Sequence, residues 1–368
     1  MRSSRAAVRA DKLRIGVVWP KPRAARWKLG KTSPTENPDL SDGLLFLEEE
    51  GFQVDIEESL PWPFNPLVNV HEFYSALDPI RAARVMARVR RYDAVICVGD
   101  ATAFFLMALR TLSGSRLPVI LIDPALGPGY PRRKRLQDYV LPRVDCVIVF
   151  GRVQLDYLRA EYGSTVRPHF IHFRADTDFY QPSDRTVTTD RPYVFSVGLD
   201  AARDFDTLAQ AAREFATEPV SDCRVVLHTS KPVSDPVGLE ISSEKVSFVR
   251  LRELYARSSV VAIPLRDAIH PGGITALVEA MAMARPIVVS ASRGLADYLE
   301  DGRNAIVVPP GDARALSSAM ATLVRSPEQA RRLGEEARRF VVSTCDNRLY
   351  AKTLATIIRD VVADGGSR

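Results

Sequence analysis

Short apolar runs alternate with amphipathic stretches along most of this chain, and this alternation restricts the fold more than any other feature of the sequence. Each run has the length and composition of a buried strand, and the stretch that follows has apolar residues at helical spacing. The runs lie at residues 13–19, 94–98, 117–123, 144–149, 193–198, 223–229, 259–264 and 287–289. The pattern predicts the α/β class, with parallel sheets covered by helices on both faces. In such sheets, ligands bind at the carboxyl ends of the strands.

The length and composition of the chain indicate an ordinary globular protein with two domains. A chain of 368 residues exceeds the usual size of a single core. Apolar residues make up 46% and charged residues 26%, and no apolar run reaches the roughly eighteen residues of a membrane-spanning helix. The first residues are basic but lack the apolar stretch of a secretory signal. The four cysteines are far apart and lie in or beside apolar runs, which predicts reduced buried thiols and a cytoplasmic location.

A glycine-rich loop that leads into a helix is the strongest indication of a binding site. Pro271, Gly272 and Gly273 cannot sit inside a regular element, and apolar residues at helical spacing follow them directly. The N–H groups in the first turn of a helix are unpaired and lie at the positive end of the helix dipole, so this loop suits an anion such as a diphosphate. Glu279 lies farther along the same helix, on a mainly apolar stretch. A carboxylate in such surroundings needs a partner, and a pair of sugar hydroxyls would supply one.

The residues around this loop resemble the donor segment of retaining glycosyltransferases of the GT-B fold, in particular glycosyltransferase family 4, also described as glycosyl transferases group 1. The matching positions keep the family's order and spacing. They are Gly273, Leu277, Glu279 to Ala282, Pro286 to Val288, Gly294, Leu295, Glu300 to Gly302, Asn304 and Val308 to Asp312. One position departs from the family: a second glutamate usually stands eight residues before Glu279, where this chain has Pro271.

The resemblance implies an enzyme with two Rossmann-like domains that face a cleft. The acceptor domain would comprise residues 1–185 and 346–368, because the last helix of such enzymes crosses back to it, and the donor domain residues 190–345. The reaction would transfer a sugar from a nucleotide sugar of the UDP or GDP type to an acceptor hydroxyl, with retention of the anomeric configuration. Neither a metal nor another cofactor is expected. Polysaccharide, glycolipid and secondary-metabolite glycoside synthesis stay open as pathways.

The resemblance also assigns the donor site. Arg203 lies near a position where the family has a phosphate-binding lysine, and a guanidinium would bind phosphate there through two parallel hydrogen bonds. Leu199 stands where another arginine is common. Arg203 and the N–H groups of Gly272, Gly273 and Ile274 are expected to stabilise the leaving diphosphate, without a protein nucleophile. The expected donor residues are Gly198, Arg203, Gly272, Gly273, Ile274, Thr275 and Glu279, with His270 or Asp267 in place of the missing glutamate.

The acceptor side is assigned from strand ends and from the first loop. Asp100 and Asp123 both follow apolar runs. Many relatives have a histidine near Asp123 that contacts the donor sugar or the acceptor, so Asp123 is a candidate for that catalytic role and Asp100 for acceptor binding. GT-B enzymes hold the acceptor with the loop after the first strand, which makes Lys21 and Arg23 acceptor-binding candidates.

Basic residues are unevenly distributed in the chain. Residues 1–40 carry ten Lys or Arg against three acids, and a second basic cluster lies at residues 132–143. Two interpretations stay open: a solvated surface, or attraction to an anionic or lipid-linked acceptor and to the inner face of a membrane. No nucleic-acid module accompanies these charges, so nucleic acid is not an expected partner. The oligomeric state is not predicted.

Three further predictions complete the interpretation. Residues 39–50 are expected to form a helix, and residues 245–248 a short strand. Relatives follow that strand with the loop that holds the nucleobase, here residues 249–254.

The alternative function is a GT-B-like nucleotide-binding or assembly protein without turnover. Pro271, Leu199 and the missing histidine support it.

Overall fold

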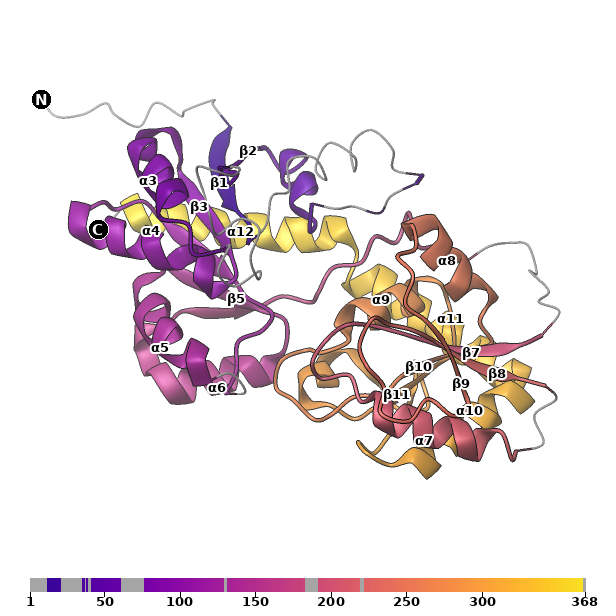
Figure 1. Ribbon diagram of the computed structural model, residues 1–368. Coiled ribbons are helices and arrows are strands. Elements are labelled where there is room, and N and C mark those ends of the chain that lie inside the picture. Colours follow the sequence, from indigo (N-terminus) through magenta and orange to yellow (C-terminus); the bar gives the residue numbers. More distant parts are fainter. Residues whose placement is uncertain are drawn as a thin grey trace, which may run out of the picture.

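The computed structural model contains two six-stranded parallel sheets, each covered by helices on both faces (Figure 1). It describes residues 12–20, 35–36, 38, 41–60, 76–128, 131–182, 191–218 and 222–366. The α/β class predicted from the alternation of runs is therefore confirmed. Because every strand pair is parallel, the ligand-binding ends of all strands in one sheet lie along the same edge.

The first sheet has the strand order β2-β1-β3-β4-β5-β6. Its strands are β1 (Leu13–Val18), β2 (Phe52–Ile56), β3 (Ala94–Val98), β4 (Val119–Ile122), β5 (Cys146–Val149) and β6 (Pro168–Phe170). Its helices are α3 (Pro79–Ala87), α4 (Asp100–Ser113), α5 (Pro131–Val140) and α6 (Arg152–Tyr162), with a 3-10 helix η1 (Leu44–Glu48). Alternate strand residues face two separate apolar clusters, because successive side chains of a strand point to opposite faces.

The second sheet has the order β12-β11-β10-β7-β8-β9. Its strands are β7 (Tyr193–Val197), β8 (Arg224–His228), β9 (Leu239–Ser242), β10 (Val260–Ile263), β11 (Ile287–Ser290) and β12 (Ile306–Val308). Helices α7 (Phe205–Phe215) and α10 (Ala313–Arg325) cover one face. Helices α8 (Phe248–Arg257), α9 (Ile274–Ala282) and α11 (Pro327–Thr344) cover the other.

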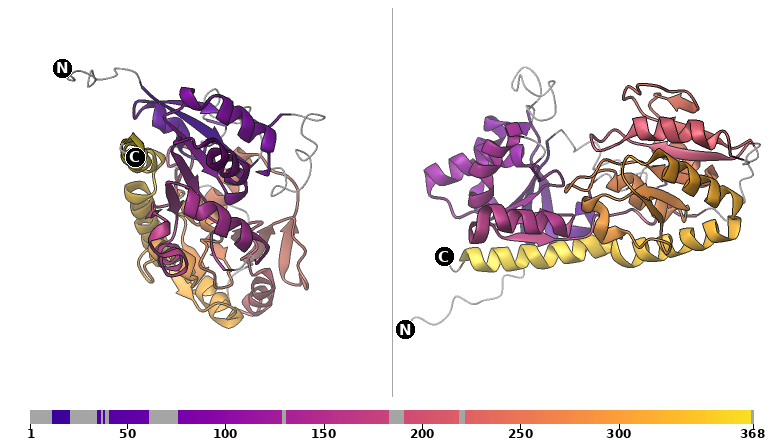
Figure 2. Two further views of the ribbon diagram at one scale, coloured as in Figure 1. Left: turned by 90° about the vertical axis from the view of Figure 1, so that its left-hand side faces the viewer. Right: turned by 90° about the horizontal axis from the view of Figure 1, so that it is seen from below.

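The last helix, α12 (Asn347–Gly366), crosses back to the first sheet (Figure 2). Its buried side chains Leu354 and Ile358 belong to the same apolar cluster as Ile15 and Leu47. Where the chain returns, Ala175 donates to the carbonyl of Cys345 at 2.6 Å and accepts from the N–H of Asn347 at 3.1 Å. The predicted crossing helix is confirmed, and the two connections between the sheets lie side by side.

Tyr298 joins the two halves of the molecule through one hydroxyl group. The side chain is fully buried, and its hydroxyl donates to the carbonyl of Phe150 at 2.6 Å while it accepts from the N–H of Phe173 at 2.8 Å. A buried hydroxyl with both a donor and an acceptor partner fixes the segments that it bridges. This contact holds the end of β5 against the 3-10 helix Arg293–Tyr298 of the second half.

Three element predictions are wrong. In residues 41–50 the structure has only the short helix η1, because Asp42 and Gly43 have φ of 60° and 77° and end any regular helix there. The edge strand is β9 rather than 245–248. Residues 249–254 are helical, since the Ser247 side chain accepts from the N–H of Arg250 at 3.1 Å and caps α8. Helix α5 was not predicted, because it carries no continuous apolar stripe.

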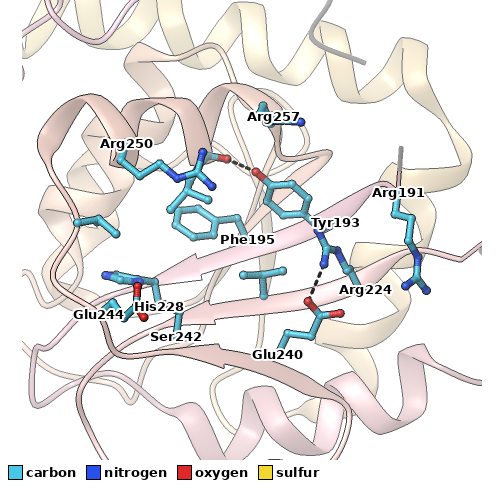
Figure 3. A pocket seen from close by; sticks show the side chains of 13 residues that line it. Arg191, Tyr193, Phe195, Arg224, His228, Glu240, Ser242, Glu244, Arg250 and Arg257 are labelled. Atoms are coloured by element: carbon cyan, nitrogen blue, oxygen red, sulfur yellow. Dashed lines mark hydrogen bonds and ion pairs between the residues drawn. The ribbon is translucent and has the colours of Figure 1, made fainter. Parts of the chain in front are cut away.

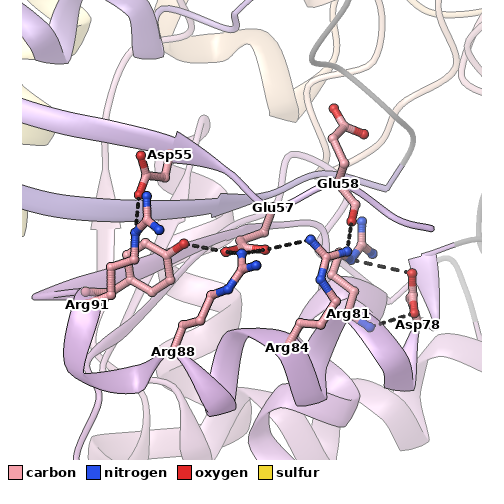
Figure 4. A network of polar contacts seen from close by, with 9 residues as sticks. Asp55, Glu57, Glu58, Asp78, Arg81, Arg84, Arg88 and Arg91 are labelled. Atoms are coloured by element: carbon pink, nitrogen blue, oxygen red, sulfur yellow. Dashed lines mark hydrogen bonds and ion pairs between the residues drawn. The ribbon is translucent and has the colours of Figure 1, made fainter.

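A buried carboxylate fixes the end of β2 against α3 (Figure 4). The side chain of Glu57 is 2% exposed, and its N–H donates to the carbonyl of Val17 at 2.9 Å. The carboxylate accepts from Arg88 at 3.1 Å, from Arg84 at 3.4 Å and from the hydroxyl of Tyr92. These contacts fix the carboxyl end of β2 in the first half of the molecule.

We expect Glu57→Ala to lower the free energy of unfolding by about 3 kcal/mol, because it leaves a buried hydroxyl and two guanidinium groups without their acceptor. Denaturant unfolding measures this change. The matched control is Glu49→Ala, since Glu49 is exposed and such substitutions change stability little. Equal stability of the two variants would contradict this account of Glu57.

Candidate functional site

A cavity of about 320 Å³ lies between the carboxyl end of β7 and the start of α9, at the place where the two sheets face each other. Six of the predicted donor residues line it, and these are Gly198, Arg203, His270, Gly273, Ile274 and Thr275. The first half of the molecule closes the cavity with Pro124, Ala125 and Phe173. The cavity therefore combines strand ends and a helix start from one half with a loop wall from the other.

Arg203 is the most unusual residue of this cavity. Only 3% of its surface is exposed, and none of its three guanidinium nitrogens has a hydrogen-bond partner among the residues that the structure describes. Burial lowers the pKa of this guanidinium to about 10. A buried cation without partners is costly, so its persistence at the wall of a cavity indicates a site for an anion. A diphosphate would satisfy the guanidinium through charge-assisted hydrogen bonds.

Gly198 explains why Arg203 can lie at the cavity wall. A Cβ atom at position 198 would lie 2.4 Å from Nε of Arg203, which is far inside van der Waals contact. The N–H of Arg203 donates to the carbonyl of Asp200 at 3.2 Å, so a tight turn brings the guanidinium back over the strand end. The glycine at the end of β7 therefore provides the space that the arginine occupies.

The glycine loop before α9 presents a smaller set of N–H donors than the sequence suggested. Gly273 caps the helix with φ of 76°, a conformation that glycine adopts without strain. The N–H of Gly272 donates to the carbonyl of His270 at 2.8 Å, and the N–H of Ile274 to that of Pro271 at 3.2 Å. These two donors are engaged within the loop. The N–H of Thr275, in the first turn, has no acceptor inside the helix and is available to an anion.

His270 and Asp200 form a polar pair at the edge of the cavity. Nε2 of His270 lies 3.6 Å from Oδ1 of Asp200, and the N–H of Ala202 donates to the same oxygen at 2.7 Å. Burial works to raise the pKa of Asp200, but the contacts with His270 and Ala202 outweigh it and lower the pKa. Asp267, the other proposed substitute for the missing glutamate, pairs with Arg293 at 2.8 Å and does not line the cavity.

Glu279, on α9, does not line the cavity and contacts Tyr255 of α8. Its Oε2 accepts from the hydroxyl of Tyr255 at 2.9 Å. Burial raises the pKa of this carboxyl, which is about 7 even though the neighbouring Tyr255 and Tyr180 hydroxyls favour the ionised form. A carboxylate offers two oxygens with several lone-pair sites, so it can accept further hydrogen bonds from hydroxyl groups.

Asp100 and Asp123 are held by an arginine instead of facing the cavity. The Arg133 guanidinium on α5 contacts Asp100 at 2.7 Å and Asp123 at 2.8 Å, and both carboxylates are buried. Burial and the charge of Asp100 raise the pKa of Asp123, Arg133 opposes part of this rise, and the resulting pKa is about 6. Neither aspartate lines the cavity. Asp123 instead accepts from the N–H of Ala125 at 2.8 Å. It thereby supports the loop of Pro124 and Ala125, which lines the cavity.

Gln154 also supports this loop, although the sequence pattern gave it no such role. It is fully buried on α6, and its Nε2 donates to the carbonyls of Pro124 and Leu126 at 3.1 and 2.9 Å. Its Oε1 accepts from the N–H groups of Phe150 and Gly151 at 3.2 and 3.1 Å. One amide thus fixes two strand-end loops at the boundary between the halves. The role of Gln154 becomes apparent only in the structure, where α6 packs against both loops.

Several predictions concern features outside this cavity. Lys21 and Arg23 lie outside the described residues. The four cysteines are free thiols, three buried and Cys223 half-buried. Within the described ranges, no three His, Cys, Asp or Glu side chains group as metal ligands would. In the same ranges, no helix is both long enough and apolar enough to cross a bilayer.

Residues 191–326 match the family described as glycosyl transferases group 1. This segment contains β7, Arg203, the glycine loop and Glu279. The second half of the chain, from β7 to α10, is therefore similar to the group 1 glycosyltransferases. Members of this family take their sugar from a nucleotide donor, so the match agrees with an anion site near a half-buried carboxylate.

Characterised group 1 glycosyltransferases resemble the chain over part of their length. The chain is 30% identical over 139 residues to the MMP alpha-(1->4)-mannosyltransferase of Mycolicibacterium hassiacum. The aligned segment covers 38% of this chain and 30% of that enzyme. It is 26% identical over 273 residues to the alpha-maltose-1-phosphate synthase of Mycolicibacterium smegmatis. This alignment covers 65% of this chain and 69% of that enzyme.

Solved structures show that the whole chain has the GT-B fold predicted from the resemblance. The sucrose-phosphate synthase of Thermosynechococcus elongatus superposes with a TM-score of 0.74 at 18% identity, over 96% of this chain and 100% of that one. Anabaena HepE in complex with UDP-glucose superposes with a TM-score of 0.69 at 14% identity, over 95% and 100%. At these identities the likeness concerns the fold.

Proposed function

We propose that this protein is a group 1 glycosyltransferase and transfers a sugar from a nucleotide sugar to an acceptor hydroxyl with retention of the anomeric configuration. One observation carries the proposal: Arg203 is a buried cation without a partner among the described residues, and it lines a cavity at a helix start. The family match and the GT-B fold support the same conclusion. HepE, a structural neighbour, binds UDP-glucose.

The proposed mechanism relies on stabilisation of the leaving group. As the bond between the anomeric carbon and the diphosphate oxygen breaks, negative charge grows on that oxygen. Arg203 and the N–H groups of Gly273 and Thr275 would meet this charge at the wall of the cavity. The acceptor oxygen forms the new bond on the same face of the sugar, and its proton passes to the leaving phosphate oxygen. No protein nucleophile takes part, and Asp123, held by Arg133, acts by supporting the cavity loop.

The acceptor side of the proposal rests on charge and position. We infer that the segment after β1 binds the acceptor, with Lys21 and Arg23 as its candidate residues in the sequence, and that the acceptor is anionic or lipid-linked. In this proposal the protein works in the cytoplasm, at the inner face of the membrane, with peripheral contact only. The acceptor domain comprises residues 1–185 and 346–368, and the donor domain residues 190–345.

A binding protein without turnover is the second candidate function. The contact of Arg133 with both Asp100 and Asp123 favours it, because neither carboxylate is presented to a substrate. The two candidates differ in one measurement. Incubation of the purified protein with UDP- and GDP-sugars should release nucleoside diphosphate slowly even without an acceptor, since water replaces the acceptor. If a nucleotide binds but none is released, the second candidate is correct; if no common donor binds, both fail.

We expect donor affinity to rise with pH through about 7, because the carboxyl of Glu279 has its pKa raised to about 7 and accepts from ribose hydroxyls when ionised. For one such group, affinity should be about tenfold lower at pH 6 than at pH 8. The stability change has the opposite sign. Because the pKa of Glu279 is higher in the folded than in the unfolded protein, this carboxyl stabilises the fold fully below its unfolded pKa. That stabilisation is lost as the pH rises through about 7.

Calorimetric titration with a nucleotide sugar measures this pH dependence, since its diphosphate diester does not titrate in that range. Glu279→Gln is the control, because an amide does not ionise there. The same pH dependence in the wild type and in Glu279→Gln would assign the titration to another group.

A further inference from the structure

A second cavity, of about 540 Å³, lies on the same face of the second sheet as α9, between α8 and strands β7 to β9 (Figure 3). Its two ends differ. At the amino ends of the strands it is lined by Arg191, Arg224, Glu240 and Arg257. At the carboxyl ends it is lined by His228, Ser242, Glu244 and Arg250. We call the whole cavity the α8 groove.

The α8 groove continues the cavity that contains Arg203. Val197 lines the Arg203 cavity, and its partner in the parallel register is His228, which lines the groove. His228 in turn pairs with Ser242 on β9. Neighbouring strands lie about 4.8 Å apart, so the groove begins one strand away from the Arg203 cavity. A nucleoside whose diphosphate contacts Arg203 therefore reaches the carboxyl end of the groove.

The floor of the groove suits a flat ring. Phe195 and Val226 from the sheet, with Val246 and Leu254 from the segment around α8, supply its apolar surface. The hydroxyl of Tyr193 donates to the carbonyl of Leu254 at 2.8 Å, which fixes α8 over the strands. Protein sites that recognise a base combine apolar contact with its faces and hydrogen bonds to its edge.

The arginines of the groove do not form a general anion site. Arg224 pairs with Glu240 at 2.7 Å, Arg250 pairs with Glu253 at 2.9 Å, and Arg191 pairs with Asp222. Three of the four lining guanidinium groups therefore already have a carboxylate partner. Glu244 adds a negative charge at the carboxyl end and forms no ion pair with another described residue. A phosphate there would be repelled by Glu244, whereas a neutral base with hydrogen-bond donors would not.

We propose that Glu244 determines the base of the donor and that this base is guanine. The inference rests on the proposed function, since it needs a nucleoside diphosphate on Arg203. An ionised carboxylate only accepts hydrogen bonds, through two adjacent oxygens. Guanine offers two adjacent donors, N1–H and the N2 amino group, that match both oxygens.

The other bases match Glu244 less well. Uracil has one N–H flanked by two carbonyl oxygens, so the second oxygen of the carboxylate would face an acceptor. Adenine presents a lone pair at N1, beside its amino group, and would face the carboxylate in the same unfavourable way. Arg250 complements guanine as well, because a guanidinium donates to O6 and N7. Its present partner is Glu253, in an exposed pair within one helix that costs little to open.

Calorimetric titration of GDP, UDP and ADP into the full-length protein tests the inference, and it needs no turnover. We expect GDP to bind at least tenfold more tightly than UDP and ADP, because a good bidentate contact discriminates between bases by about that factor or more. In Glu244→Gln, one carboxylate oxygen becomes an NH₂ donor that faces a donor of guanine. GDP affinity should fall about tenfold, while UDP affinity should rise, because the new NH₂ group can donate to the uracil carbonyl that the carboxylate oxygen faced.

Glu240→Gln is the matched control, because Glu240 lines the amino end of the same groove. It should leave the preference for GDP unchanged. UDP or ADP binding as tightly as GDP, or an unchanged GDP affinity in Glu244→Gln, would overturn the inference while the proposed function stands. If none of the three diphosphates binds, the proposed function fails, and the assignment of guanine fails with it.

Discussion

Arg203→Met should reduce kcat/KM for the nucleotide sugar by about 100- to 1,000-fold, which is the usual loss when one donor to a developing negative charge is removed. The guanidinium has no described partner in the free protein, so its binding energy is available to the diphosphate of the donor and to the leaving group. Methionine keeps a similar length of apolar chain next to Gly198, and the cavity should keep its shape. The measurement is initial-rate kinetics with the preferred donor.

The same substitution should not destabilise the free protein. It removes a buried charge without a hydrogen-bond partner among the described residues, and the loss of such a charge is neutral or stabilising. We therefore expect an equal or higher thermal midpoint together with the loss of activity, a combination that misfolding cannot produce. The matched control is Arg266→Met, an arginine with a half-exposed side chain that pairs with Asp204 at 3.5 Å. Full activity in Arg203→Met would remove Arg203 from the donor site.

Glu279→Ala should weaken the binding of nucleoside diphosphates by about 10- to 100-fold, because a hydrogen bond to a charged group contributes about 1.5–3 kcal/mol. In the free protein the carboxylate accepts from Tyr255, and burial raises its pKa to about 7. Ribose hydroxyls would add donors and favour the ionised form. Titration calorimetry at pH 8, where the carboxyl is ionised, measures the loss.

Inorganic pyrophosphate provides the control for Glu279, since it has the two linked phosphates of a nucleoside diphosphate but no ribose. Its affinity should be the same in the wild type and in Glu279→Ala. An equal loss for pyrophosphate and for the nucleoside diphosphate would mean that the substitution disturbs the whole cavity. Unchanged affinity for the nucleoside diphosphate would remove Glu279 from the ribose site.

Local patterns in the sequence predicted the parts of the site that local structure forms. The glycine loop and the start of α9 follow from the breaker cluster at 271–273 and the helical spacing after it. The parallel sheets follow from apolar runs that are buried on both faces. The sequence could not predict that Arg203 is buried without a partner, because this depends on the turn at Asp200 and on the space left by Gly198.

Contacts between residues that are distant in the sequence account for the corrected assignments. Asp100 and Asp123 lie at strand ends, as predicted, but Arg133 comes from a helix that the sequence pattern did not reveal. Gln154 connects two loops that are far apart in the chain. Residues 249–254, predicted as a loop, are helical because Ser247 caps α8 directly. In the proposed base site, the polar residues come from β8, from the segment after β9 and from α8.

A crystal structure with a bound nucleoside diphosphate tests the central claim most directly. We predict phosphate oxygens within about 2.7–2.9 Å of the Arg203 guanidinium, the usual length of a charge-assisted hydrogen bond. The same phosphate should lie at the start of α9, beside Gly273 and Thr275. A nucleotide whose phosphates lie away from Arg203, with the guanidinium still lacking a partner, would contradict the account.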